Sequence, residues 1–208
     1  PKATSKAKPE ILHMLGNRGD QEAKLLFESA LSYHEGAVRQ AAAEAVAKIS
    51  GKEAADVLIY YMTSYPDAAD QEAAINAFKT IAGNEEVIRL YPAIDYCTSS
   101  SGKKSIIELM AWKKIHAQLK MIMPYTSYSD ESVRGAAYKA LAALAQPEDQ
   151  ESFIKLLAGT ENPVYITNIQ EALAASAGKI VDPEKRSTEI LKTLNDQKLK
   201  TKLIPVLA

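Results

Sequence analysis

The sequence is poor in the residues from which covalent and metal-based sites are built. It contains one cysteine, Cys97, and three histidines, His13, His34 and His116, among 208 residues. A single cysteine cannot close an intrachain disulfide or supply a multi-cysteine metal site. None of the histidines has a second ligand at a helical spacing such as His-Glu-x-x-His. We therefore expect no metal site and no cofactor in this chain.

The sequence also lacks an excess of positive charge. Lys and Arg number 25 against 26 Asp and Glu, for a formal net charge of −1. A general nucleic-acid binder needs an excess of basic residues to displace counterions, so the composition argues against nucleic acid as a partner. Two local basic groups keep that alternative open, and we interpret them as solvated helix faces. They are Lys103, Lys104, Lys113, Lys114 and Lys120 around Trp112, and Lys198, Lys200 and Lys202 near the end.

Long apolar runs, secretory signals and catalytic glycine motifs are absent too. No run approaches the roughly 20 apolar residues that span a bilayer, and neither a Gly-x-Ser-x-Gly elbow nor a phosphate-binding glycine loop occurs. These absences favour a chain that is not an enzyme and leave its compartment open. The chain starts without Met and stops within the apolar helical pattern LIPVLA, so we expect a piece of a longer protein.

What the sequence has is a repeated helical pattern. Residues 37–49, AVRQAAAEAVAKI, place apolar side chains on one stripe of a helix, and residues 132–144, SVRGAAYKALAAL, repeat that stripe. Similar segments recur at about 32 residues, and each follows another helical segment, so every unit is a leading helix and a trailing helix. A period of this length without strand signals predicts stacked helix pairs. Small alanines on the trailing helices allow the close packing that stacking needs.

A tyrosine recurs with the same period. Tyr33, Tyr65, Tyr96 and Tyr128 come at the ends of leading helices with separations of 32, 31 and 32, which explains why TSYPD at 63–67 returns as TSYSD at 126–130. One interpretation is that each ring packs on its own helix pair. The other is an aromatic ridge for a protein or a glycan, since tyrosine is enriched in interfaces. The turn after Tyr96, CTSSSGKK, is expected to be the longest.

These features resemble the HEAT-like repeats of the phycobilisome-lyase type. The family's trailing helix opens with an acid, Val-Arg and spaced alanines, which Asp130, Val133 and Arg134 reproduce, as do Val38 and Arg39 with Glu35 as the acid. Pro92 and Pro124 stand where the family's leading helix carries a kinking proline. The resemblance implies a right-handed α-solenoid that serves as a scaffold. Some proteins with this repeat attach chromophores or excise damaged bases, so an enzyme is the alternative.

We therefore predict an all-α solenoid of about six helix pairs over residues 9–208, preceded by a disordered tail or linker at residues 1–8. Arg39 and Arg134 are predicted to bridge to an acidic turn residue of the adjacent unit. The predicted function is a non-catalytic scaffold or protein-interaction module, with an accessory domain of a larger enzyme as a further alternative. The candidate binding residues are the four tyrosines and three polar residues of the concave trailing-helix face, Gln40, Glu44 and Lys139.

Overall fold

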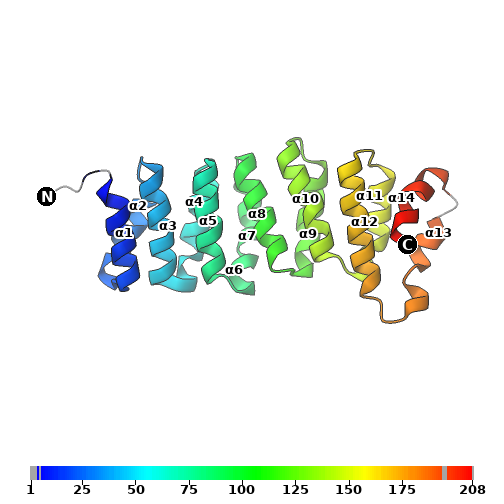
Figure 1. The fold of residues 1–208 in the computed structure, drawn as a ribbon, viewed down its shortest axis with the longest axis horizontal. Helices are drawn as coiled ribbons and strands as arrows, with labels where there is room; N and C mark the ends of the chain where they lie inside the picture. The colour runs from blue at the N-terminus through cyan, green and yellow to red at the C-terminus, as the bar shows by residue number, and fades with distance from the viewer. Residues whose placement is uncertain (1–3, 5, 194–195, 208) are drawn as a thin grey trace. The chain divides into compact units, whose positions relative to one another are not determined.

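The computed structural model describes residues 4, 6–193 and 196–207, and within those ranges it contains helices and no strand (Figure 1). The prediction of an all-α repeat fold is therefore confirmed. The helices divide into two compact units, Pro1–Met110 and Ala111–Ala208. Residues 1–3 and 5 of the predicted tail lie outside the described residues, whereas Ala7 and Lys8 are the first residues of a helix.

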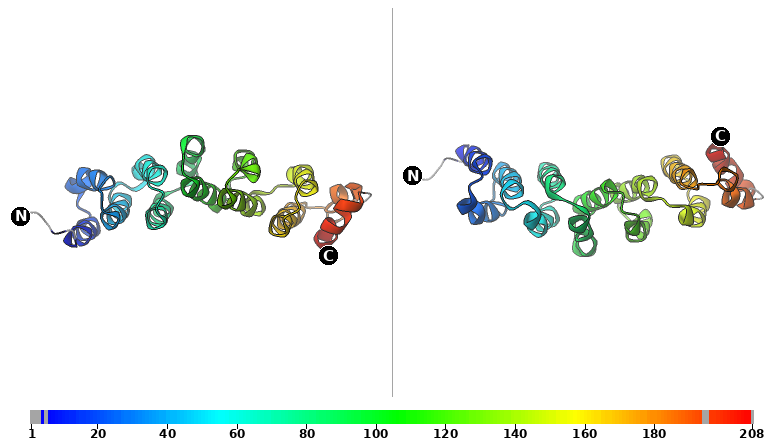
Figure 2. Two further views of the ribbon diagram at one scale, coloured as in Figure 1. Left: turned by 90° about the horizontal axis from the view of Figure 1, so that it is seen from above. Right: turned by 90° about the horizontal axis from the view of Figure 1, so that it is seen from below.

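In the first unit, three trailing helices form a row: α1 (Ala7–Arg18) packs on α3 (Gly36–Ser50), and α3 packs on α5 (Ala68–Ile81). The leading helices α2 (Lys24–Ala30) and α4 (Ala55–Ser64) pack on α3 and α5, and lie on one side of that row in Figure 2. Two short leading helices, α6 (Asn84–Ile88) and α7 (Leu90–Tyr96), precede the last trailing helix of this unit. That trailing helix is α8 (Ser100–Trp112), which extends past the end of the unit at Met110.

The second unit repeats this arrangement. The trailing helices α10 (Glu131–Leu144), α12 (Pro163–Gly178) and α14 (Gln197–Leu207) pack in succession. The leading helix α11 (Gln150–Ala158) packs on α12, and α9 (Leu119–Ile122) packs on α10. The last leading helix is α13 (Thr188–Thr193). The described residues thus contain six leading-trailing pairs, with α1 as an additional trailing helix.

Short polar residues start the trailing helices. The Asp67 carboxylate accepts the backbone N–H of Ala69 before α5, and Asp130 accepts those of Ser132 and Val133 before α10. Such residues satisfy N–H groups that have no partner inside the helix. Ser99 acts in the same way before α8, since its hydroxyl oxygen accepts the N–H of Gly102 at 3.1 Å. The turn after Tyr96 is consequently short, and the prediction of a long CTSSSGKK turn is wrong.

The two predicted kinking prolines interrupt leading helices. A helical proline clashes with the carbonyl four residues earlier. Four residues before Pro92 is Ile88, where α6 ends, and α7 begins at Leu90. Around Pro124 the chain leaves α9 at Ile122 and continues as a 3-10 helix over Met123–Ser127. Both leading helices are therefore divided into short helical segments.

Small side chains bring the trailing helices of the first unit close together. Ala42, Ala43 and Ala45 of α3 are buried, and a Cβ added at Gly16 of α1 would lie 3.0 Å from the Cβ of Ala45. The larger core side chains come from the leading helices, such as Leu58 and Met62 of α4, which are also buried. This division of sizes lets each helix pair cover its neighbour's apolar surface.

Candidate functional site

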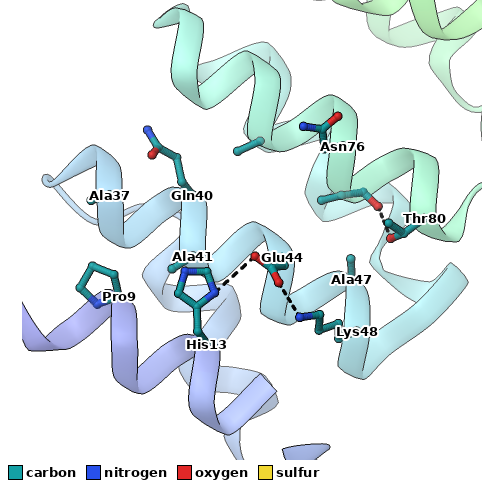
Figure 3. Close-up of a pocket in the computed structure, with 12 residues that line it drawn as sticks. Pro9, His13, Ala37, Gln40, Ala41, Glu44, Ala47, Lys48, Asn76 and Thr80 are labelled. Atoms are coloured by element: carbon teal, nitrogen blue, oxygen red, sulfur yellow. Dashed lines mark hydrogen bonds and ion pairs between the residues drawn. The ribbon is translucent and has the colours of Figure 1, made fainter. Parts of the chain in front are cut away.

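A groove crosses the three trailing helices α1, α3 and α5 of the first unit (Figure 3). Its volume is about 770 Å³. The helices that form it carry alanine where larger residues would fill the space, so the hollow follows directly from the alanine-rich trailing pattern. Its small lining residues are Ala37, Ala41, Ala47, Ala73 and Ala77.

The charged side chains of the groove are already paired with one another. Lys48 of α3 donates to the carboxylate of Glu44, one helical turn earlier, and to Asn17 Oδ1 of α1 at 2.7 Å. His13 Nδ1 of α1 lies 3.3 Å from Glu44 Oε2, as Figure 3 shows. The hydrogen bond from Lys48 lowers the pKa of Glu44 below its ordinary value. The carboxylate is thus held ionised between two neighbouring groups and leaves little uncompensated charge in the groove.

Two amide side chains in the groove are different, because they have no hydrogen-bond partner among the described residues. Gln40 extends from α3 and Asn76 from α5, and both line the hollow (Figure 3). The hydroxyl of Thr80, by contrast, donates to the Ala77 carbonyl at 2.7 Å. An amide offers two donors and one acceptor oxygen. The groove therefore combines an apolar floor with two amides that are available to a ligand.

The structure brings Gln40 and Glu44 together in this groove, and it places Lys139 elsewhere. Lys139 belongs to α10 of the second unit, where its side chain is exposed. The groove is also lined by residues that were not predicted from the sequence, namely His13, Lys48, Asn76 and Thr80. A signal for two of them exists in the repeat, since Asn76 and Thr80 follow Glu44 and Lys48 by 32 residues.

The predicted tyrosine row does not occupy a single structural position. Tyr65 and Tyr128 are the residues that directly follow their leading helical segments, and their backbone is extended. After α7 that position belongs to Cys97, which is buried, so Tyr96 is the last residue of the helix and is 60% exposed. Tyr96 therefore lies one residue before the position of Tyr65 and Tyr128, whereas Tyr33 lies three residues after the end of α2. The binding role of the row stays a prediction.

Tyr33 and Tyr65 are partly covered by cations of the first unit. The Tyr33 hydroxyl accepts a hydrogen bond from Lys8, whose ammonium also lies 4.5 Å from the centre of the ring. The guanidinium of Arg39 lies 4.4 Å from the centre of the Tyr65 ring. Cation–π contacts of this kind stabilise a partly buried ring. These two tyrosines therefore take part in packing within the unit.

Arg39 is also the centre of a buried polar cluster. It forms an ion pair with Asp70 of α5, and its Nη1 donates to the carbonyls of Tyr33 at 2.8 Å and His34 at 3.0 Å. The hydroxyl of Tyr61 donates to Asp70 at 2.5 Å. Burial, followed by this hydrogen bond, raises the pKa of Tyr61 above its ordinary value. The predicted pairing of Arg39 with an acid of the adjacent unit is confirmed, but the acid lies in the first turn of helix α5 and not in the turn before it.

Arg134 differs from Arg39. Its Nη1 donates to the carbonyls of Tyr128 at 2.8 Å and Ser129 at 2.7 Å, but the described residues supply no carboxylate partner. Asp70 follows Arg39 by 31 residues, and the same step from Arg134 leads to Tyr165, which stacks on Tyr138 with 4.2 Å between ring centres. The second unit thus replaces the ion pair with an aromatic pair, contrary to the prediction.

The lysines of the two predicted basic groups differ in burial and in their contacts. Lys103 is buried and donates to the Ile94 carbonyl, whereas Lys104 lies 3.8 Å from Glu108 on the same helix. Near the end of the chain, Lys202 donates to the Thr160 carbonyl at 2.6 Å and pairs with Glu161. The side chain of Lys198 lies outside the described residues. Several of these lysines therefore have structural contacts of their own.

The described part of the chain offers neither a metal-binding cluster nor a helix that could span a membrane. No group of three or more His, Cys, Asp and Glu residues there could hold a metal ion. Cys97 is buried, with Sγ 3.6 Å from the Ser99 carbonyl oxygen. Among the described helices, none has the length and apolar character required to cross a bilayer.

Comparison with known proteins points to one repeat family. Residues 3–79 match the model for HEAT repeats. A search of curated proteins finds no match. Among solved structures, a chain of the complex of CpcE and CpcF of phycocyanin lyase from Nostoc sp. PCC7120 aligns with 17% identity and a TM-score of 0.48, over 99% of this chain and 88% of the other. Residues 3–79 are thus similar to HEAT repeats, and the described residues form an all-α repeat fold.

Proposed function

We propose that the chain is a non-catalytic protein-interaction module that binds an extended segment of a partner polypeptide in the groove across α1, α3 and α5. The observation that carries this proposal is the pairing of an alanine-lined hollow with the two free amides of Gln40 and Asn76. The function rests on the first unit alone.

The amides favour a polypeptide as the ligand, because a peptide group needs the same two functions that they offer. The backbone of an extended chain presents N–H donors and C=O acceptors that have no partner within that chain. Gln40 and Asn76 stand on neighbouring helices, whose axes are about 8–10 Å apart in close packing. An extended chain advances about 3.3–3.6 Å per residue, so two amides so placed support peptide groups about three residues apart in a ligand that crosses the helices.

The apolar floor and the paired charges of the groove determine which kind of side chain the ligand carries at its centre. Apolar side chains of the partner gain about 25 cal/mol per Å² of surface that they bury against the alanines. Glu44 already pairs with Lys48 and lies beside His13, so a charged side chain at the centre would lose water without gaining a free counter-charge. The bound segment is therefore apolar and uncharged at its centre.

A peptide selection on the intact chain tests this proposal. A displayed library of random linear peptides is selected on the 208-residue protein, and the affinities of the enriched peptides are then measured for variants. Ala73→Trp fills the groove at a partly exposed position of α5, whereas Ala69→Trp adds the same ring at an exposed position of α5 outside the groove lining. We expect Ala73→Trp to abolish binding and Ala69→Trp to leave it unchanged.

Two results would contradict the proposal. Peptides that bind the Ala73→Trp variant as tightly as the unchanged protein would place the ligand outside the groove. Enrichment of peptides with a charged centre would contradict the uncharged ligand derived above. Circular dichroism of both variants verifies that neither change has unfolded the helices.

A further inference from the structure

Three leucines of the first unit mark a second surface. Leu26, Leu58 and Leu90 are spaced by 32 residues and lie in the leading helices α2, α4 and α7. Leu58 and Leu90 are fully buried, whereas Leu26 is 49% exposed. Neighbouring helices cover the leucine of α4 and the leucine of α7. Of the three leucines, only Leu26 of α2 is left partly uncovered.

The trailing helix α1 shows the same loss of cover. Ile11 and Met14 are 36% and 51% exposed, although the residues 31 positions later, Ala42 and Ala45 of α3, are buried. A step of 32 leads to Ala43 and Val46, which are buried as well. The helix α3 is covered by its leading helix α2. Among the described residues, α1 has no leading helix that would cover Ile11 and Met14.

These two uncovered faces meet in a groove. A cavity of about 340 Å³ lies between α1 and α2, lined by Ile11 and Leu12 of the former and Leu26 and Ala30 of the latter. The neighbouring Leu25 is also exposed. Stacked repeats stay soluble when their end units carry a polar outer face. This end of the first unit instead exposes several apolar side chains, next to Lys8, Ser29 and Tyr33, which also line the cavity. An exposed apolar patch is typical of a surface that another element covers.

We propose that this α1–α2 face binds an amphipathic α-helix of a partner protein, which docks as a leading helix docks within the repeat. The interface between leading and trailing helices continues from α4–α5 to α2–α3, and the α1–α2 face presents the next position in that series. The chemistry of the occupant is that of the leading helices of this chain. In α4 the buried residues Ala55, Leu58, Ile59 and Met62 follow an i, i+3, i+4, i+7 pattern.

This docking face is separate from the groove across α1, α3 and α5. Of its lining residues, none is shared with that groove. A partner helix and an extended peptide would therefore bind to different sides of α1. Failure of either proposal leaves the other unaffected.

The probe for this face is a fluorescein-labelled synthetic peptide with the sequence of residues 51–66, which includes α4. It is titrated into the 208-residue protein while the anisotropy is recorded. We expect saturable binding that Leu26→Asp weakens by about tenfold or more, because the carboxylate would be buried in an apolar interface. The exposed apolar residue Val181 of the second unit provides the control, and Val181→Asp should leave the affinity unchanged.

Further measurements decide between the remaining occupants. Ile11→Lys, at a partly exposed lining residue of α1, offers a second variant in case Leu26→Asp disturbs folding, and a peptide with Leu58→Asp should not bind. The Ala73→Trp variant should bind the helix peptide normally. Sedimentation of the unchanged protein should show a monomer.

Concentration-dependent association that Leu26→Asp abolishes would mean that a second copy covers the face, and would overturn the proposal. Absence of peptide binding to a monomeric protein would overturn it as well. So would equal binding to the unchanged protein and to both face variants.

Discussion

Arg39 and Asp70 form a buried ion pair between two consecutive helix pairs. Nε of Arg39 lies 3.3 Å from Oδ1 of Asp70, and Nη2 contacts the other carboxylate oxygen, so the contact has two points. Asp70 is 1% exposed and also accepts the hydroxyl hydrogen bond of Tyr61. Buried charges of this kind are tolerated because each remaining hydrogen-bonding atom is satisfied. The pair therefore links α3 to α5.

Arg39→Met is expected to lower the free energy of unfolding by about 3 kcal/mol, since it leaves the Asp70 carboxylate buried without its cation. The matched control is Arg134→Met, at the equivalent position of the second unit, where only hydrogen bonds to two carbonyls are lost. That change should cost about 1–2 kcal/mol. Urea unfolding followed by circular dichroism measures both. Equal losses would mean that the carboxylate contributes nothing beyond the carbonyl contacts.

The same cluster predicts a dependence on alkaline pH. The pKa of Tyr61 is raised in the folded chain, chiefly by burial and then by its hydrogen bond to Asp70. A raised pKa contributes stability below the unfolded value of about 10, and that stability is lost as the pH rises above it, because the unfolded phenol ionises first. The stability advantage of the unchanged protein over Tyr61→Phe should therefore shrink above about pH 10.

Urea midpoints at several pH values measure this effect, and Tyr60→Phe is the control because Tyr60 is exposed on the same helix. A difference between the unchanged protein and Tyr61→Phe that stays constant through the alkaline range would contradict the buried position of the phenol.

The sequence predicts the helix pairs well because their signals are local and repeat. Val38 and Val133 begin apolar stripes that become buried faces of α3 and α10, and Asp130 starts α10 as its type suggests. The pairing of Arg39 with an acid also follows from the repeat. The identity of Asp70 does not, since it depends on the relative height of two helices, which a spacing near 32 determines only to within about one residue.

Two predictions about the end of α7 were wrong because they did not account for single residues there. Tyr96 belongs to the 32-residue tyrosine pattern, but Cys97 occupies the position that Tyr65 has after α4. The interpretation of CTSSSGKK as a long turn missed that Ser99 caps α8. The groove itself could be predicted only in part. Gln40 and Glu44 follow from the trailing-helix face, whereas its depth depends on how closely α1, α3 and α5 pack.

The shifted register of Tyr96 gives a stability prediction. Tyr65→Ala removes a ring that contacts Arg39 and lies 5.5 Å from the ring of Tyr61, and should cost about 2 kcal/mol. Tyr96→Ala removes a largely exposed ring and should change stability by less than about 0.5 kcal/mol. Thermal unfolding distinguishes these outcomes. A comparable loss from Tyr96→Ala would show that its ring is packed as the others are.

The buried position of Cys97 is tested through Gly102. A Cβ added at Gly102 would lie 2.5 Å from Cys97 Sγ, 2.8 Å from Ser99 Oγ and 3.2 Å from the Met62 carbonyl oxygen. Gly102→Ala should therefore destabilise the fold by about 1–3 kcal/mol through overpacking. Cys97→Ala removes the closest atom, so the double variant should lose less stability than the sum of the single changes. Strict additivity in urea unfolding would contradict this contact.

The free amides of the groove give the most direct test of how a peptide is held. Gln40→Leu and Asn76→Leu keep the approximate size of each side chain but remove its donors and acceptor. Each change should weaken the binding of a selected peptide about five- to tenfold, which corresponds to one lost hydrogen bond. Since neither amide has a partner among the described residues, the thermal stability of the free protein should not fall.

Asn84→Leu, at an exposed amide of α6 outside the groove, is the control and should leave the affinity unchanged. Retained affinity in both groove variants would mean that the apolar floor alone holds the ligand. The two amides would then form no hydrogen bonds to the peptide backbone.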